Sequence, residues 1–119
     1  MKNGGGIGML EDELKRAIET FNQKAQTDEK LQSEIKGKVR SVLVELTDSE
    51  SFNFTLKDSR LGPLGKGKLE NPDIHITTDS VTMEALMKRE MGPMKALVTK
   101  RLKLTKISME DLSTLRKFF

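Results

Sequence analysis

Three strand-like runs and one helical stretch follow one another between Phe52 and Leu104, and this order constrains the fold more than any other feature of the chain. In each run, apolar residues alternate with polar ones: Phe52/Phe54/Leu56, Ile74/Ile76 and Leu102/Leu104. Side chains two residues apart lie on the same face of a strand. Each run therefore predicts a strand with one apolar face and one polar face.

Four methionines lie between the second and third runs: Met83, Met87, Met91 and Met94. Their spacing of four, four and three residues places them along one side of successive helical turns, until Gly92-Pro93 interrupts the pattern. Methionine is unbranched and polarizable, so it adapts its shape to varied neighbours. Two interpretations follow: the methionines fill a core, or they line a deformable lipid pocket.

The composition indicates one soluble domain. A chain of 119 residues has room for one sizeable core, and its 35% apolar and 33% charged residues are typical of a globular protein. We find no window of about 18 apolar residues and no signal-peptide hydrophobic region, and we therefore expect a cytoplasmic protein. The absence of cysteine excludes disulfides, thiolate nucleophiles and sulfur-ligated metals.

The first half of the chain predicts a tail, two helices and a hairpin. Residues 1–8 are rich in glycine and read as a flexible tail, so the domain spans residues 9–119. Apolar residues spaced at three and four predict an amphipathic helix over residues 9–25: Leu10, Leu14, Ala17, Ile18 and Phe21. Thr27 or Asp28 can cap a second helix that ends at Gly37, and strands over residues 38–46 and 52–57 then form a hairpin.

The remaining elements alternate between strands and helices. We expect a weak third strand over residues 64–69, which completes an antiparallel meander, and a fourth strand over residues 74–78. Asp79 or Ser80 caps a helix that ends near Gly92, and a short helix over residues 93–98 begins at a proline. The fifth strand covers residues 100–106, and Ser108 with Asp111 opens a last helix.

Positive charge is concentrated in the last third of the chain. Residues 81–119 carry 9 basic and 4 acidic side chains, and five cations occur with no acid between Met91 and Met109: Lys95, Lys100, Arg101, Lys103 and Lys106. This stretch is either a solvated strand face or a surface that meets a phosphate, a carboxylate head group or an anionic membrane. Nucleic acid is disfavoured as a partner, because the chain has no Trp or Tyr to stack on bases.

Residues suited to catalysis are scarce. His75 is the only histidine, and it alternates with Ile74 and Ile76, so it faces away from the apolar side of its strand. A single histidine cannot form a zinc site, and the serines lack another conventional base. The acidic residues near the helix starts are explained by the helix dipole. We therefore expect a protein that is not an enzyme and needs no cofactor.

The order of these elements resembles the sterol carrier protein type-2 family. The residues from Pro72 to Thr77 are similar to the family's Ala-Asp-Cys/Val-Thr-Ile strand, and the segment from Leu86 to Leu97 resembles its Leu-Met-x-Gly-Lys-x-x-Pro-x-x-Ala-Phe pattern. Arg101 to Leu104 matches its Lys-Leu-Lys-Ile strand. The resemblance implies an α+β fold, in which about five helices cover one face of a single five-stranded mixed sheet and enclose an apolar tunnel.

The chain also departs from this family pattern. Glycines that the family often places near these segments are Arg89, Lys100 and Lys106 in this sequence, which predicts different backbone turns there. The family takes fatty acids, acyl-CoA or sterols. The chain also ends at its last helix, so Phe118 and Phe119 would have to close the tunnel. These features favour a linear acyl chain over a sterol as the ligand.

Together, the residues and the resemblance predict non-enzymatic binding and transfer of fatty acids or fatty acyl-CoA. The predicted ligand wall consists of Phe54, Leu56, Ile76, Met83, Met87, Met94, Leu97, Leu102, Leu104, Leu115 and Phe119. The predicted head-group residues are Lys95, Lys100 and Arg101. We expect a monomer or weak homodimer that makes transient contact with anionic membranes. The alternative is a packed accessory or dimerisation module of a lipid-metabolism complex, without lipid transfer.

Overall fold

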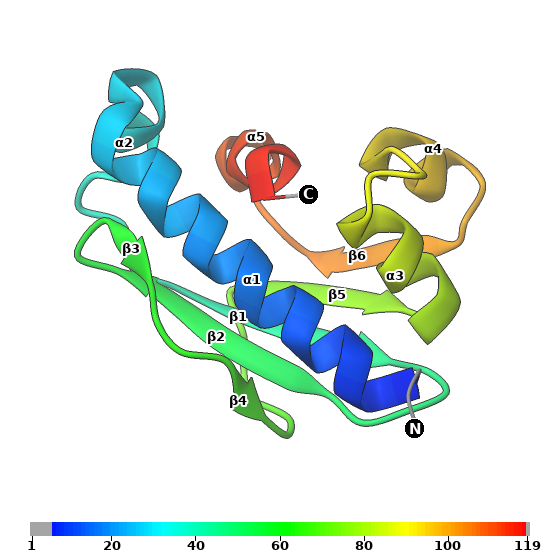
Figure 1. Ribbon diagram of the computed structural model, residues 1–119. Helices are drawn as coiled ribbons and strands as arrows, with labels where there is room; N and C mark the ends of the chain where they lie inside the picture. The colour runs from blue at the N-terminus through cyan, green and yellow to red at the C-terminus, as the bar shows by residue number, and fades with distance from the viewer. Residues whose placement is uncertain (1–5, 119) are drawn as a thin grey trace.

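The protein folds into one sheet with helices on one side, as seen in a computed structural model that describes residues 6–118 and their side chains from residue 10 onward (Figure 1). The strands are β1 (Arg40–Leu46), β2 (Phe52–Lys57), β3 (Arg60–Leu61), β4 (Gly65–Lys66), β5 (Ile74–Thr78) and β6 (Leu102–Lys106). The helices are α1 (Gly6–Thr27), α2 (Glu29–Ile35), α3 (Ser80–Met87), α4 (Pro93–Val98) and α5 (Met109–Phe118). None of the described helices is long and apolar enough to span a membrane.

The sheet is mixed, as predicted, and its strand order is β3-β2-β1-β5-β6. Strand β1 pairs antiparallel with β2 and parallel with β5, and β5 pairs antiparallel with β6. Val42 on β1 lies opposite Phe54 on β2 and opposite Ile74 on β5, so their side chains share one face. This face carries the alternating apolar residues of the sequence pattern, and the helices cover it.

Helix α1 crosses the covered face along its whole length (Figure 1). Its apolar stripe is buried and consists of Leu10, Leu14, Ile18, Phe21 and Ala25. The side chain of Asn22 also binds the edge strand β3: it accepts a hydrogen bond from the Leu61 N–H at 2.7 Å and donates one to the Leu61 carbonyl at 3.0 Å. This pair of bonds satisfies backbone groups that a sheet edge leaves exposed.

The predicted helix starts are confirmed where a polar side chain caps the helix. Asp28 accepts a hydrogen bond from the Leu31 N–H, and Asp79 accepts one from the Thr82 N–H at 2.7 Å. The Ser108 hydroxyl accepts one from the Asp111 N–H at 3.1 Å. These bonds satisfy N–H groups in the first turn of each helix, which have no carbonyl partner within the helix.

Three element boundaries differ from the sequence prediction. Of the third strand predicted over residues 64–69, only Gly65–Lys66 (β4) forms a strand. A further short strand, Arg60–Leu61 (β3), precedes it, and Gly62-Pro63 separates the two. Both pair with β2, and the sheet therefore has six strands. Helix α1 begins at Gly6, inside the predicted tail, whose first five residues lie outside the described part. Helix α3 ends at Met87, before Gly92, because Arg89 adopts a left-handed backbone with φ of 61°.

The positions where the family often has glycine adopt the glycine conformation at two of three sites. Arg89 has φ of 61° and Lys100 has φ of 64°. The expectation that the backbone turns differently there is therefore wrong at these two residues. The turns are kept although the side chains are large, and such a backbone costs a non-glycine residue about 1–2 kcal/mol.

We predict that Lys100→Gly stabilises the protein by about 0.5–1 kcal/mol. Glycine removes the left-handed strain of about 1–2 kcal/mol, and this gain exceeds the additional conformational entropy that glycine loses on folding. Lys95→Gly is the matched control: it removes a cation from the interior of α4 and should destabilise by about 0.5–1 kcal/mol. Urea unfolding of both variants measures the difference. Equal destabilisation by the two substitutions would contradict the strain at Lys100.

Candidate functional site

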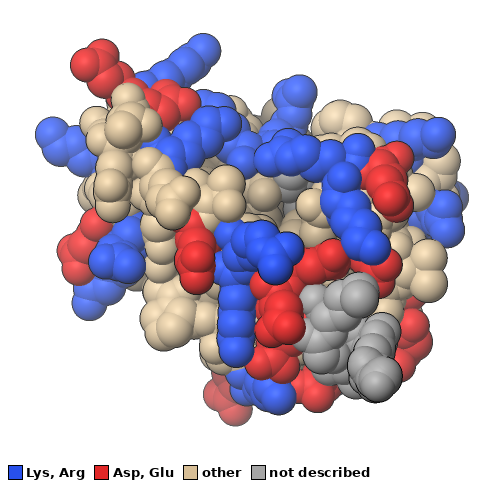
Figure 2. All heavy atoms as spheres, in the orientation of Figure 1, with Lys and Arg blue, Asp and Glu red and all other residues tan. Residues whose placement is uncertain are grey.

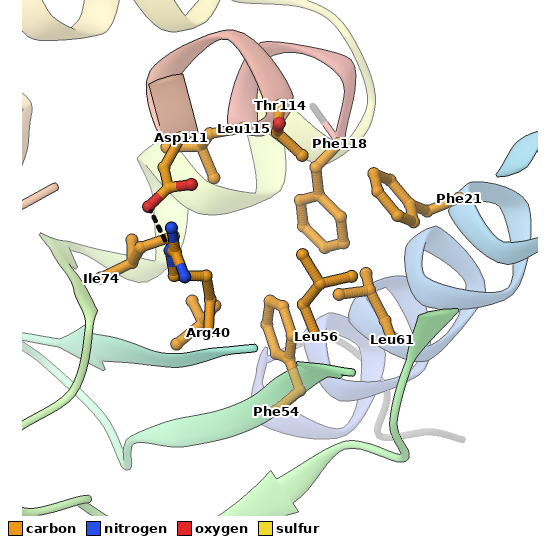
Figure 3. Close-up of a pocket in the computed structure, with 11 residues that line it drawn as sticks. Phe21, Arg40, Phe54, Leu56, Leu61, Ile74, Asp111, Thr114, Leu115 and Phe118 are labelled. Atoms are coloured by element: carbon orange, nitrogen blue, oxygen red, sulfur yellow. Dashed lines mark hydrogen bonds and ion pairs between the residues drawn. The ribbon is translucent and has the colours of Figure 1, made fainter. Parts of the chain in front are cut away.

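An apolar cavity of about 40 Å³ lies between α5 and the covered face of the sheet. Strands β1 and β2 supply Val42, Phe54 and Leu56, and α5 supplies Leu115 and Phe118 (Figure 3). The remaining lining residues come from α1 and from strands β1, β3, β5 and helix α5: Phe21, Arg40, Leu61, Ile74, Asp111 and Thr114. A space of this size holds a few water-sized groups and is far smaller than the several hundred Å³ of an open ligand pocket.

One end of the cavity is formed by an ion pair. Arg40 donates from Nε to Asp111 Oδ2 at 2.8 Å, and Lys38 Nζ lies 3.6 Å from Asp111 Oδ1. Burial raises the pKa of Asp111, but hydrogen bonds from Arg40 and Ser108 outweigh it and hold that pKa below its ordinary value. The same bond from Asp111 raises the pKa of Arg40. The pair fastens the first turn of α5 to strand β1.

Aromatic rings border the other end of the cavity. The Phe118 ring stacks on Phe54 with centroids 5.4 Å apart, and it lies 6.4 Å from the Phe21 ring. Beside it, Lys117 Nζ donates to Glu34 Oε1 at 2.8 Å and fastens the last turn of α5 to α2. The hydrogen bond from Lys117 lowers the pKa of Glu34. Helix α5 is therefore held by ion pairs in its first and last turns, and it contributes the apolar side chains of Leu115 and Phe118 to the cavity.

Two surface hollows adjoin the cavity. One is a groove of about 380 Å³ between α1, α3 and α5, which shares Phe21 and Phe118 with the cavity. We call it the basic groove, and it is lined by Glu13, Arg16, Ala17, Thr20, Phe21, Lys24, Met87, Lys88, Arg89, Lys117 and Phe118. The other, between α1 and residues 60–64, shares only Leu61 with the cavity.

Three residues of the predicted ligand wall line the cavity: Phe54, Leu56 and Leu115. Ile76, Met83 and Leu102 are buried in the general core, and Leu97 and Leu104 pack against that core with partial exposure. Phe119 lies outside the described residues. The predicted wall residues of the sheet thus lie on the same face as the cavity. The cavity itself, however, lies over β1 and β2 and not beneath α3 and α4.

The methionine stripe is split between three environments. Met83 is fully buried, Met87 lies in the basic groove, and Met94 on α4 is 47% exposed. The stripe is broken because α3 ends at Met87, so the helical spacing does not continue to Met91 and Met94. The core-filling interpretation holds for Met83, whereas Met94 is not part of a buried pocket wall.

The predicted head-group cations Lys95, Lys100 and Arg101 are exposed on α4 and at the start of β6. None of them lines the cavity or the basic groove. The cations of the groove instead come from α1, the end of α3 and α5. The sequence did not indicate this grouping, because the three elements are far apart along the chain.

Several cavity residues were not identified as a site from the sequence. Phe21 was predicted only as part of the apolar stripe of α1, and Asp111 only as a helix-capping residue. Thr114 carried no signal. For Arg40 a signal was available, because a cation at the start of an apolar strand needs a partner when it is partly buried.

The site offers no catalytic arrangement among the described residues. His75 lies on the face of the sheet opposite the cavity, where its Nε2 is 2.8 Å from Glu45 Oε1. That hydrogen bond lowers the pKa of Glu45. Among the described residues, no cluster of three or more His, Cys, Asp or Glu side chains could hold a metal ion. The geometry instead suits the burial of an apolar group.

A protein-family model described as the SCP-2 sterol transfer family matches residues 14–116. The chain belongs to this family. The family is one of lipid-binding domains, and the α+β architecture with its mixed sheet is the SCP2 fold. No curated protein matches the chain.

Solved structures with the same fold include several SCP2 proteins. The UbiJ-SCP2 ubiquinone synthesis protein has 12% identity and a TM-score of 0.63, with 98% of this chain and 93% of that chain covered. Palmitated SCP2L2 from Aedes aegypti has 17% identity and a TM-score of 0.53, with 85% and 88% covered. The chain spans only 14% of the inverting sec-alkylsulfatase Pisa1 from Pseudomonas, with 73% of this chain covered, 16% identity and a TM-score of 0.59.

We predict that Asp111→Asn destabilises the SCP2 domain by about 1–3 kcal/mol at pH 7, because it leaves Arg40 without its carboxylate. The pKa of Asp111 is lower in the folded state than in the unfolded chain. Ionised Asp111 therefore contributes its full stabilisation of the fold above the ordinary carboxyl pKa, and this contribution is lost as the pH falls through the lowered pKa of the folded state. The difference between wild type and variant should therefore shrink below about pH 4.

Urea unfolding at several pH values measures this difference. Glu110→Gln is the matched control, because Glu110 also contacts Lys38 but is 76% exposed, and its loss should cost under about 0.5 kcal/mol. A gap between wild type and Asp111→Asn that stays constant down to pH 2.5 would contradict the assigned linkage.

Proposed function

We propose that this SCP2 domain reversibly binds one single-chain lipid, a fatty acid or a fatty acyl-CoA, and carries it without catalysing a reaction. The observation that carries the proposal is the apolar cavity under α5, which adjoins the basic groove at Phe21 and Phe118. The lipid tail would occupy the cavity after the Phe118 ring and the last turn of α5 move aside. Family membership and the palmitated relative add support.

The groove at Phe118 is a better entrance than the hollow at Leu61. Leu61 belongs to a paired strand, and both of its backbone polar groups are bonded to the Asn22 side chain. Phe118 lies in the last turn of α5, where ring contacts and the ion pair from Lys117 to Glu34 hold the helix. Helix ends open at lower free-energy cost than paired strands.

The energetics allow this rearrangement. A tail of about 14 methylenes gains about 11 kcal/mol when it is buried at roughly 0.8 kcal/mol each. Moving the Phe118 ring into water costs about 1.5–3 kcal/mol, and association costs at least several kcal/mol more. The remainder is at most about 4–6 kcal/mol, which corresponds to binding between about 0.1 and 1 mM. The cavity of about 40 Å³ has room for only about one or two methylenes, so burial of a longer tail requires a wider opening under α5.

A second candidate function is a packed accessory module that binds a protein partner and no lipid. The small volume of the cavity favours it, since a filled core is what a scaffold needs. The likeness to the UbiJ-SCP2 ubiquinone synthesis protein is consistent with such a role. The two candidates differ in one measurable property, saturable lipid binding.

We expect native mass spectrometry of the purified protein to detect a lipid adduct, and a fluorescent fatty acid to bind with one-to-one stoichiometry. Competition with palmitoyl-CoA and with cholesterol ranks the ligand classes, and cholesterol should compete least because it is rigid and wide. A ligand-free spectrum without saturable binding would reject the carrier and favour the accessory module.

Two substitutions under α5 should shift the fatty-acid affinity in opposite directions. Phe118→Ala joins cavity and groove, so we expect up to about tenfold tighter binding, together with a stability loss of about 3 kcal/mol. Leu115→Trp fills the cavity and should weaken binding more than about tenfold. Met94→Trp is the control, because that side chain is exposed on α4, and it should leave affinity within about twofold. Fluorescence titration measures all three, and weaker binding by Phe118→Ala would contradict the entrance at Phe118.

A further inference from the structure

Five cations gather around the basic groove, which faces solvent beside the cavity. Of its lining residues, Arg16 and Lys24 come from α1, Lys88 and Arg89 from the end of α3, and Lys117 from α5. Glu13 is the only carboxylate among the lining residues. Figure 2 shows Lys and Arg side chains gathered in the upper part of the view, where Figure 1 places α5, α4 and one end of α1. The chain as a whole has a net charge of only +3, so this grouping is local.

The charge of the groove is only partly neutralised by the protein itself. Lys88 is paired with Glu84 at 2.9 Å, and Lys117 is paired with Glu34 at 2.8 Å. Arg16 and Lys24 are exposed and form no ion pair within 4 Å in the described part of the chain. They lie on the rim of a groove whose floor is apolar and includes Phe21, Met87 and Phe118. A rim of this kind suits a molecule with an anionic head and an apolar tail.

Arg89 has φ of 61° because it terminates α3, and Lys100 has a similar conformation after α4. Arg89 follows the end of α3, and a helix C-terminus does not by itself attract an anion, so the groove depends on its side chains for positive charge.

We propose that the basic groove binds the negatively charged head group of the lipid, with Arg16 and Lys24 as its unpaired contacts. This inference rests on the proposed function, because the tail of the same ligand lies in the adjoining cavity. A phosphate monoester carries up to two negative charges and three terminal acceptor oxygens, whereas a carboxylate carries one charge and two oxygens. A groove lined by several cations therefore favours the phosphate ester over the carboxylate.

The test compares three ligands with the same 16-carbon chain: hexadecyl phosphate, palmitate and hexadecanol. Binding is measured by native mass spectrometry, and Arg16→Glu/Lys24→Glu is compared with Lys95→Glu/Lys100→Glu. Both double variants change the net charge equally, but the second changes exposed cations outside the groove. We expect the groove variant to weaken hexadecyl phosphate about tenfold, palmitate less, and hexadecanol under about twofold. The control variant should leave all three within about twofold.

The outcomes separate this inference from the proposed function. If hexadecanol binds the wild type but hexadecyl phosphate binds no tighter, or if both double variants have equal effects, the head-group site is wrong and the lipid carrier stands. If none of the three ligands binds, both are wrong. A second measurement needs no variant: raising the salt concentration from about 20 to 500 mM should weaken hexadecyl phosphate and leave hexadecanol unchanged. Equal salt dependence for the two ligands would overturn the site.

Discussion

The burial of one apolar stripe of α1 holds the rest of the structure together. Leu10, Leu14, Ile18 and Phe21 are almost completely buried, and α1 packs against α2, α3, α5 and the edge strand β3. At about 1.5–3 kcal/mol for each large side chain, the stripe gains roughly 6–12 kcal/mol, which is comparable to the whole net stability of a small domain. Helices α3 and α5 therefore depend on α1 for the position of their own apolar faces.

Helix α5 is only partly covered, and the cavity lies beneath it. Of its apolar side chains, Leu115 and Phe118 are buried, whereas Met109 is 85% exposed. Polar contacts at the two ends compensate: Asp111 is bound to Arg40, and Lys117 is bound to Glu34. If the last turn of α5 opens, the contacts of Phe118 with Phe54 on β2 and with Phe21 on α1 are lost together.

Local signals in the sequence determine most of the fold. The turn at Asn71-Pro72-Asp73 and the cap at Asp79 delimit β5 and the start of α3, and the period-two runs identify the covered face of the sheet. The failures occur where the deciding contact is distant. The methionine spacing continues past Met87 in the sequence, but the left-handed backbone at Arg89 ends the helix. The cavity combines Phe21, Arg40 and Phe118, which no local pattern connects.

For the proposed carrier, the packing of Phe118 on Phe54 would limit how tightly a tail can bind, because the ring has to move before the tail enters. If the Phe118 ring costs about 1.5–3 kcal/mol to expose, the open form makes up roughly one molecule in ten to one in a hundred or fewer. Apparent affinity falls by that fraction. For the proposed carrier, a short chain would gain too little to displace the ring. The aromatic contact of Phe118 with Phe54 would then set a minimum length for the ligand, because each added methylene contributes about 0.8 kcal/mol against a fixed cost.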